Sequence, residues 1–255
     1  MLFRLCLLLL IVTSAGCASA PERLAFNRFG EAPVFVWSQP NDPYLASLRS
    51  SLKLDALISA GDTDYQKVQK ITAWVHGLWA HNGVNKPSQN DPLTIVSEAG
   101  KGSRFRCVEY SIVLAGALNA VGIKARRLGL KTRDVETRRS GAGHVVTEAY
   151  LADEERWIMA DGQFGLIPTL EGRPINAVEL QAALAEGAAG LDVHAGSGAR
   201  GWFGWFGFVG PYLHYFDTRY DSRLSSPMPV GRHLMLVPLG EKEPRIFQRT
   251  DPSDD

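Results

Sequence analysis

Cysteine is scarce in this sequence, and the scarcity limits what the remaining cysteine can do. Three cysteines occur in 255 residues, and two of them, Cys6 and Cys17, lie within the first seventeen positions. Only Cys107 remains in the body of the chain. In an exported protein, a cysteine without a second cysteine has no internal disulfide to form. Cys107 is therefore either a small buried apolar residue or a reactive thiol, and its surroundings must decide between these interpretations.

The sequence also lacks an excess of charge, a phosphate-binding loop and a metal-ligand cluster. Lysine plus arginine and aspartate plus glutamate both number 27, so no overall field favours nucleic acid. The glycine-rich run GSGARG does not open a helix after a strand, as a phosphate-binding loop requires. The six histidines show no metal-ligand spacing. We therefore expect no nucleic-acid partner, no cofactor and no metal.

The N-terminal residues have the pattern of a secretory signal peptide. Arg4 precedes an apolar run shorter than the roughly 18 residues of a membrane-spanning helix, and the small residues SAG precede Cys17. Small residues that end at a cysteine resemble the bacterial lipoprotein processing site, where the cysteine is lipidated and becomes the mature N terminus. We expect residues 1–16 to be the signal peptide, lipidation at Cys17, and a location in the bacterial periplasm or at the membrane.

Hydrophobic periodicity predicts helices first and strands later. The expected helices cover residues 44–58, 63–82, 93–99 and 107–121, and an alanine-rich helix follows the capping residue Asn176. The expected strands cover residues 124–132 and 232–240, and residues 144–151 and 156–162 form a hairpin. Residues 34–37 fit either a strand or an arm packed on the surface. The aromatic stretch from Trp202 to Phe216 can line a groove, enter a membrane surface or close the core, and core closure is the favoured interpretation.

Cys107 occupies a position that favours a thiolate, which is the form of the thiol that attacks a carbonyl. The partial positive charge of a helix N terminus falls on it, and Arg104 and Arg106 precede it. If these arginines are only solvated, the helix effect alone remains. Backbone N–H groups at this helix start are the natural donors to an oxyanion.

His144 and Asp161 are predicted to meet across the hairpin. His144 opens the first strand and Asp161 ends the returning one. With a two-residue turn at 153–154, opposed residue numbers sum to 307, so Asp161 faces Val146 and lies diagonal to His144 on the same face. A four-residue turn keeps this parity, whereas a three-residue turn needs a bulge. The imidazole can then take the thiol proton while the carboxylate fixes its tautomer.

Side-chain donors to an oxyanion are harder to identify from the sequence. Trp74, Trp79 and Gln163 are the candidates, although a role as core or surface residues is favoured for each.

Three blocks, GSRFRCVEYSIVLAGALNAVGIKARRL, GHVVTEAYL and RWIMADGQFG, resemble the core of the transglutaminase-like superfamily. With the preceding helix, the resemblance covers roughly residues 62–168. It implies that Cys107 is the nucleophile, His144 the base and Asp161 the acid that orients the base. It also implies an α+β, papain/transglutaminase-like fold, in which a helical part with the nucleophile packs on an antiparallel sheet that carries His144 and Asp161.

The predicted organisation follows from this resemblance. Residues 17–61 are an N-terminal extension with one helix, residues 62–175 are the catalytic core, and residues 176–255 are an extension packed on the core. The predicted activity is hydrolysis or acyl transfer, through a thioester, at an amide bond of a peptide, protein or peptidoglycan-type substrate. A non-catalytic envelope binding or scaffold protein is the alternative. An arylamine or other small-molecule acyltransferase shares the triad, but the sequence shows no signature of an acyl-donor pocket.

Overall fold

The computed structural model of the chain describes residues 22–27, 33–196, 204–223 and 233–245. The predicted signal peptide, Cys17, Trp202 and Phe203 lie outside these described residues. Within the described ranges, no helix is long and apolar enough to span a membrane.

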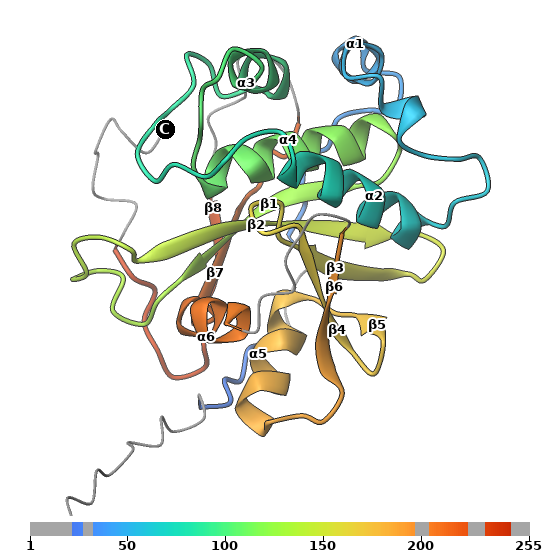
Figure 1. Cartoon of the computed structure of the whole chain (residues 1–255). Coiled ribbons are helices and arrows are strands. Elements are labelled where there is room, and N and C mark those ends of the chain that lie inside the picture. Colours follow the sequence, from blue (N-terminus) through green and yellow to red (C-terminus); the bar gives the residue numbers. More distant parts are fainter. Residues whose placement is uncertain (1–21, 28–32, 197–203, 224–232, 246–255) are drawn as a thin grey trace, which may run out of the picture.

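A five-stranded antiparallel sheet lies at the centre of the molecule (Figure 1). Its strands follow the order β3-β2-β1-β7-β8. Their bounds are Ala125–Lys131 for β1, Gly143–Leu151 for β2, Arg156–Ala160 for β3, Tyr215–Arg219 for β7 and His233–Leu236 for β8. The predicted hairpin is β2–β3, with Leu151 opposite Arg156 as the last pair before a four-residue turn. The outer strands β7 and β8 come from the segment predicted as a C-terminal extension, so this segment completes the central sheet.

Four helices cover one face of this sheet (Figure 1). They are α1 (Pro43–Ser51), α2 (Asp64–His76), α3 (Pro92–Ala99) and α4 (Cys107–Ala120). Helix α4 packs directly on β1 and β2, and α1, α2 and α3 pack around it. A helix enclosed in this way must be apolar on nearly all sides, and almost every residue of α4 after its first two is buried. The sheet and the three outer helices therefore fix the position of the helix that begins at Cys107.

Two helices end earlier in the structure than the sequence predicts. The helix expected over residues 44–58 ends at Ser51, because Lys53 adopts a left-handed backbone conformation with φ of 52° and the short 3-10 turn η1 (Leu54–Ala56) follows. The helix expected to reach residue 82 ends at His76, with Gly77 at its C-cap. The chain then turns, and the Asn82 N–H donates to the carbonyl of Phe105, 2.8 Å away. This bond joins the end of the turn to the segment just before α4.

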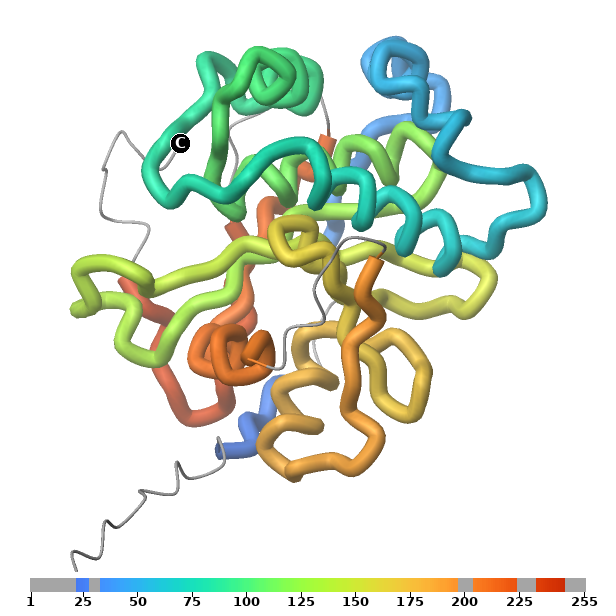
Figure 2. Tube along the Cα trace, in the orientation of Figure 1, coloured from blue at the N-terminus to red at the C-terminus, as the bar shows by residue number. Residues whose placement is uncertain are grey.

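The other face of the central sheet carries a second, smaller layer (Figure 2). A three-stranded sheet has the order β5-β4-β6, with β4 at Leu166–Leu170, β5 at Arg173–Pro174 and β6 at Leu191–Ala195. Helix α5 (Ala177–Glu186), the short helix α6 (Trp205–Val209) and the 3-10 turn η2 (Gly210–Tyr212) complete this layer. Asn176 caps α5 as predicted, with its side-chain oxygen accepting from the Val178 and Glu179 N–H groups. None of the three small strands was predicted.

The N-terminal arm packs on the surface and joins no sheet as a strand. Val36 forms a single parallel bridge with Asp221. Trp37 stacks on Trp157 of β3, with ring centroids 5.8 Å apart. The predicted α+β class is confirmed, with two hydrophobic cores on opposite faces of one antiparallel sheet.

Candidate active site

Cys107 is the first residue of α4 and is half-buried. Within the described residues it is the only free cysteine. The first turn of α4 presents backbone N–H groups that have no partner inside the helix. Cys107 therefore lies where a thiolate and a developing oxyanion both meet positive partial charge.

The charge of Arg106 is taken up within the helix start. Glu109, which is fully buried, accepts from the Arg106 backbone N–H at 3.0 Å and pairs with its guanidinium at 2.8 Å. Arg104 is exposed. The expectation that both arginines favour a thiolate is therefore too strong for Arg106, because the nearer carboxylate compensates its charge. The N terminus of α4 and the neighbouring histidine remain as the positive groups at the sulfur.

His144 and Asp161 form the predicted contact. Opposed residues of β2 and β3 sum to 307 along the whole pairing, from Leu151 and Arg156 to Thr147 and Ala160. The pairing stops there, and Asp161 bridges to Leu166 instead. The edge of β2 next to His144 is thereby left open on this side. His144 Nε2 lies 2.8 Å from Asp161 Oδ2, so Nδ1 is the ring nitrogen left to face the thiol.

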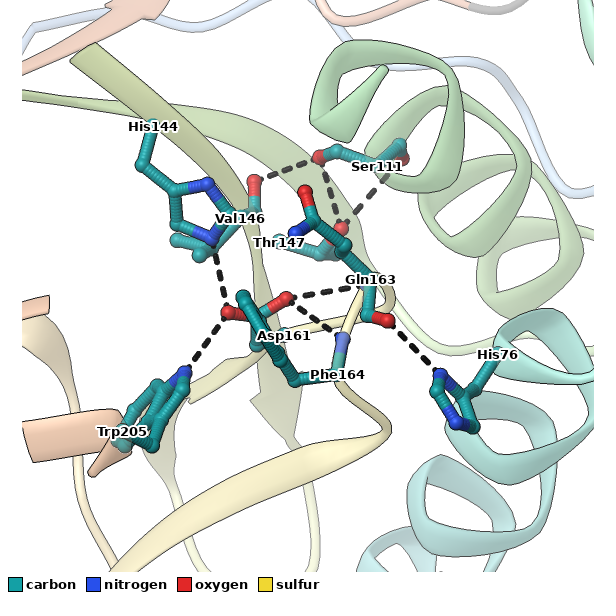
Figure 3. A network of polar contacts seen from close by, with 9 residues as sticks. All are labelled: His76, Ser111, His144, Val146, Thr147, Asp161, Gln163, Phe164 and Trp205. Atoms are coloured by element: carbon teal, nitrogen blue, oxygen red, sulfur yellow. Dashed lines mark hydrogen bonds and ion pairs between the residues drawn. The ribbon is translucent and has the colours of Figure 1, made fainter. Parts of the chain in front are cut away.

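Asp161 is fully buried, and four groups hold its carboxylate (Figure 3). Oδ2 accepts a hydrogen bond from His144 Nε2 and a second one from the indole N–H of Trp205, whose Nε1 lies 3.1 Å away. Oδ1 accepts from the backbone N–H groups of Gln163 and Phe164 at 3.0 and 3.2 Å. A buried carboxylate with this many donors has its orientation fixed from every side. Asp161 can therefore orient the imidazole without moving.

Burial, Asp161 and Cys107 act in different directions on the pKa of His144. Burial of the ring lowers it, whereas the charge and hydrogen bond of Asp161, followed by the hydrogen bond and charge of Cys107, raise it. The balance raises the pKa of His144 from 6.5 to about 10. The protonated imidazole is thus stabilised, mainly by the Asp161 carboxylate and further by its contact with the Cys107 sulfur.

Aromatic side chains enclose the imidazole. Phe208 meets His144 edge-on with ring centroids 5.2 Å apart, and the rings of Phe164 and Tyr212 lie at 6.0 and 6.2 Å. Phe208 and Tyr212 belong to the aromatic stretch for which core closure was favoured. Trp205 from this stretch is fully buried, which agrees with core closure, but the stretch also forms a wall of the candidate site.

A buried hydroxyl pair fastens α4 to β2. The Ser111 hydroxyl lies one helical turn after Cys107, 2.6 Å from the carbonyl of Val146 and 2.9 Å from the Thr147 hydroxyl (Figure 3). Val146 and Thr147 follow His144 closely on β2. This link holds the strand of the candidate base against the helix of the candidate nucleophile.

The three candidate oxyanion donors differ in their environments. Trp79 is buried between Phe105 and Tyr110, and its indole N–H has no hydrogen-bond partner in the described part of the chain. Gln163 uses its backbone on both sides, since its N–H binds Asp161 and its carbonyl accepts from His76 Nδ1 at 2.8 Å. Trp74 is half-buried and packs against the core under α4. Trp79 is therefore the candidate with a donor to spare.

Trp205 and His76 are the site residues that the sequence analysis missed. Trp205 lies 44 positions after its acceptor Asp161, and His76 lies 87 positions before Gln163. No short-range pattern reports contacts over such separations. The density of aromatic residues in the C-terminal segment was the one available signal.

His81 lies on an exposed turn near the same groups. Burial lowers its pKa most, His144 lowers it further, and Asp161 and Glu109 oppose this.

Among the described residues, no three histidine, cysteine, aspartate or glutamate side chains gather so that they could hold a metal ion.

Comparison with protein families matches residues 53–162 to the transglutaminase-like superfamily. No curated protein matches the sequence. A candidate cysteine protease from Cytophaga hutchinsonii is 15% identical over 79% of this chain and 56% of its own, with a TM-score of 0.40. Red sea bream transglutaminase is 16% identical over 49% of this chain and 27% of its own, with a TM-score of 0.31.

A candidate protease from Parabacteroides distasonis is 16% identical over 46% of this chain and 25% of its own, with a TM-score of 0.33. This chain thus spans between a quarter and just over half of the length of these three proteins. The family match begins ahead of α2 and ends directly after Asp161, so it contains Cys107, His144 and Asp161. The part of the chain that carries these three residues is thus similar to the transglutaminase-like superfamily.

Proposed function

We propose that this chain catalyses acyl transfer or hydrolysis at an amide bond through a thioester on Cys107. The observation that carries the proposal is the buried hydrogen bond between His144 and Asp161, together with the contact of the same imidazole with the Cys107 thiol. An imidazole held between a sulfur and a carboxylate is the arrangement that cysteine nucleophiles require.

The proposed reaction balances over two steps. The Cys107 sulfur attacks the amide carbonyl, and the C–N bond breaks after the amine has received a proton from His144 Nδ1. The acyl group remains on sulfur as a thioester. Water or a second amine then gives a proton to His144 and attacks the thioester. The acid or the new amide is released, and the Cys107 sulfur and the protonated His144 are restored.

The carbonyl oxygen becomes negative during both attacks. Backbone N–H groups in the first turn of α4 are the proposed donors to this oxyanion. The buried indole N–H of Trp79 has no partner among the described residues and is the proposed side-chain donor. The Asp161 carboxylate orients the ring.

The proposed substrate is a peptide, a protein or peptidoglycan-type material outside the cytoplasm. The proposal rests on the N-terminal pattern, which favours export to the bacterial periplasm and lipidation at Cys17. Incorporation of labelled fatty acid into the chain measures this lipidation. A Cys17→Ala substitution should abolish the incorporation.

Alkylation of the thiol tests the proposed nucleophile. The native chain is expected to react with iodoacetamide at mildly acidic pH, where glutathione in the same sample barely reacts, because the start of α4 and the His144 imidazole activate the sulfur as a nucleophile. Cys107→Ser should abolish this labelling and lower turnover of peptide and peptidoglycan-derived probes by at least about a thousandfold. His144→Ala should remove the reactivity at low pH and leave the thiol reactive at high pH.

Undiminished turnover in Cys107→Ser would rule out the thioester mechanism. A Cys107 thiol that is no more reactive than glutathione would instead favour a non-catalytic envelope protein that retains the fold.

A further inference from the structure

Three aromatic side chains at the candidate site remain partly exposed to solvent. They are Phe164 in the turn after β3, Phe208 of α6 and Tyr212 of η2, and we call them the aromatic wall. Each is half-buried, whereas Trp205 of the same C-terminal segment is fully buried. Closure of the core therefore accounts for Trp205 and leaves part of the apolar surface of the aromatic wall in contact with water.

The rings of the aromatic wall pack on one another and on the candidate base. The ring centroid of Phe208 lies 5.1 Å from that of Phe164 and 5.4 Å from that of Tyr212. The His144 centroid lies 5.2 Å from that of Phe208, 6.0 Å from that of Phe164 and 6.2 Å from that of Tyr212. These separations are those of rings in direct contact. The wall is therefore one continuous apolar surface beside the imidazole.

The proposed reaction brings an amine to this imidazole. His144 Nε2 is engaged by Asp161 at 2.8 Å, so Nδ1 is the nitrogen that exchanges protons with the leaving or the attacking amine. Proton exchange requires the amine nitrogen within about 3 Å of Nδ1. The side chain on the carbon next to that nitrogen then lies at the distance of the rings that pack on the same imidazole.

The chemistry of the aromatic wall favours an apolar neighbour for this carbon. None of its three rings carries a charge, and each Å² of apolar surface that leaves water contributes about 25 cal/mol. A methyl group covers little of such a surface, whereas a benzyl or isobutyl group covers more and packs against the ring faces and edges. All three residues lie outside the matched segment, residues 53–162, so a selectivity of this origin is particular to the later part of this chain.

We propose that the aromatic wall is the subsite for a bulky apolar side chain on the residue whose amine leaves or attacks. The inference rests on the proposed function, because acyl transfer through Cys107 defines which amine lies at His144. It narrows the substrate to amides of residues such as phenylalanine and leucine, and the acceptor in a transfer reaction to their free amines.

Transfer of an acetyl group to free amines tests the subsite on the full native chain. 4-Nitrophenyl acetate supplies an acyl group without an amine side chain: the Cys107 sulfur forms a thioester, and 4-nitrophenol leaves with the thiol proton. Phenylalaninamide, leucinamide or alaninamide then attacks the thioester, which forms the C–N bond, breaks the C–S bond and passes the amine proton to His144. Mass spectrometry measures the acetylated amides.

The same amides in reaction with S-acetylglutathione give their intrinsic reactivity. We expect the yield ratio of acetyl-phenylalaninamide to acetyl-alaninamide to be at least about tenfold higher on the protein than on S-acetylglutathione, the usual discrimination of an apolar subsite. The ratio for leucinamide should also be raised.

Phe208→Ala and Tyr212→Ala should each reduce this ratio toward its value on S-acetylglutathione. The two residues lie in separate elements, so one variant retains the test if the melting temperature shows that the other fails to fold. Phe35→Ala is the matched control, because Phe35 is also half-buried and stacks on Tyr220, with ring centroids 5.8 Å apart, away from His144. Its ratio should equal that of the native chain.

Equal ratios on the protein and on S-acetylglutathione would overturn the subsite, and so would a preference that survives both substitutions. Hydrolysis of the acetyl group at a rate that none of the amides changes would overturn it as well. Failure of 4-nitrophenyl acetate to acetylate Cys107 would instead reject the proposed function.

Calorimetry on Cys107→Ala separates the two failures, because it measures binding without the thiol. Phenylalaninamide should bind at least about tenfold more tightly than alaninamide. Equal binding of the two amides would overturn the subsite whether or not Cys107 is acetylated. Tighter binding of N-acetylglucosamine than of phenylalaninamide would assign the aromatic wall to a sugar and overturn its assignment to an apolar side chain.

Discussion

Asp161 shows how one buried carboxylate can organise the candidate site. It lies at the point where β3 leaves β2, and its two oxygens receive an imidazole, an indole and two backbone N–H groups. Each of these donors comes from a different part of the chain or from the turn itself. Removal of the carboxylate would therefore release His144 on one side and the turn on the other.

The raised pKa of His144 predicts a pH dependence of stability. A group whose pKa is higher in the folded state than its ordinary 6.5 stabilises the fold fully below that pH, and the contribution is lost as the pH rises through about 10. The free energy of unfolding of the native chain, relative to Asp161→Asn, should therefore be largest below pH 6.5 and shrink toward pH 10. Urea denaturation at a series of pH values measures this difference. A difference that stays constant over the whole range would contradict the ion pair.

At the scale of elements, a long helix and a short helix meet at the candidate site from opposite faces of the sheet. Helix α4 brings Cys107 from the face covered by helices, and α6 brings Trp205 from the other face. Groups from the two faces of the sheet come together at the edge of β2, beyond the end of its pairing with β3. The C-terminal helix is therefore part of the support of the site.

Trp205→Phe tests this support. The substitution retains an aromatic ring in the core, removes the indole N–H that donates to Asp161 Oδ2 and leaves a smaller side chain in a fully buried position. We expect a loss of at least about 1.5–3 kcal/mol in the free energy of unfolding, the range for hydrogen bonds to charged groups, because the smaller ring adds a packing loss to the lost hydrogen bond. We also expect kcat to fall about tenfold with little change in KM, because the imidazole is less well oriented.

Trp37→Phe is the matched control, since Trp37 is half-buried on the N-terminal arm and stacks on Trp157 away from the site. Equal losses of kcat in the two variants would mean that Trp205 acts on general stability alone. The pH profile of iodoacetamide labelling should change in Trp205→Phe and stay unchanged in the control.

On the scale of the whole molecule, the predicted core at residues 62–175 contains only β1, β2 and β3 of the five-stranded central sheet. Strand β1 pairs with β7, and β7 pairs with β8, although both come after residue 175. The core on the face opposite α4 takes Trp205, Val209, Leu213 and Phe216 from the same C-terminal segment. The matched family segment, residues 53–162, also ends before this segment begins.

A chain that ends at residue 175 is therefore expected to lack a cooperative unfolding transition. It loses two strands of the central sheet and leaves apolar surface of β1 and β4 exposed to water. The lost burial exceeds the small free energy of unfolding of a typical domain. Thermal denaturation followed by circular dichroism measures the transition. A chain that ends at residue 245 retains every described element and serves as the control. A cooperative transition in the shorter chain would show that the core folds independently.

Much of the candidate site follows from local patterns. The helix start at Cys107 follows from apolar spacing, and the parity of the hairpin brings His144 near Asp161 for a two- or a four-residue turn. The predicted helix ends at residues 58 and 82 were wrong, because apolar spacing continues past Ser51 and His76, where the helices end and the chain changes direction. Periodicity describes which face is buried and does not report where tertiary contacts end an element.

The sequence by itself determined the isolated cysteine at a helix start, the β2–β3 register and the similarity of the core to the transglutaminase-like superfamily, because all three depend on residues close along the chain. Only the tertiary structure decided the strand order, the hydrogen bond from the indole of Trp205 to Asp161, and the compensation of Arg106 by the buried Glu109. Most of these depend on segments far apart in the sequence, and the ion pair depends on burial. Loop closure and packing of the two cores select them, and no local spacing encodes that choice.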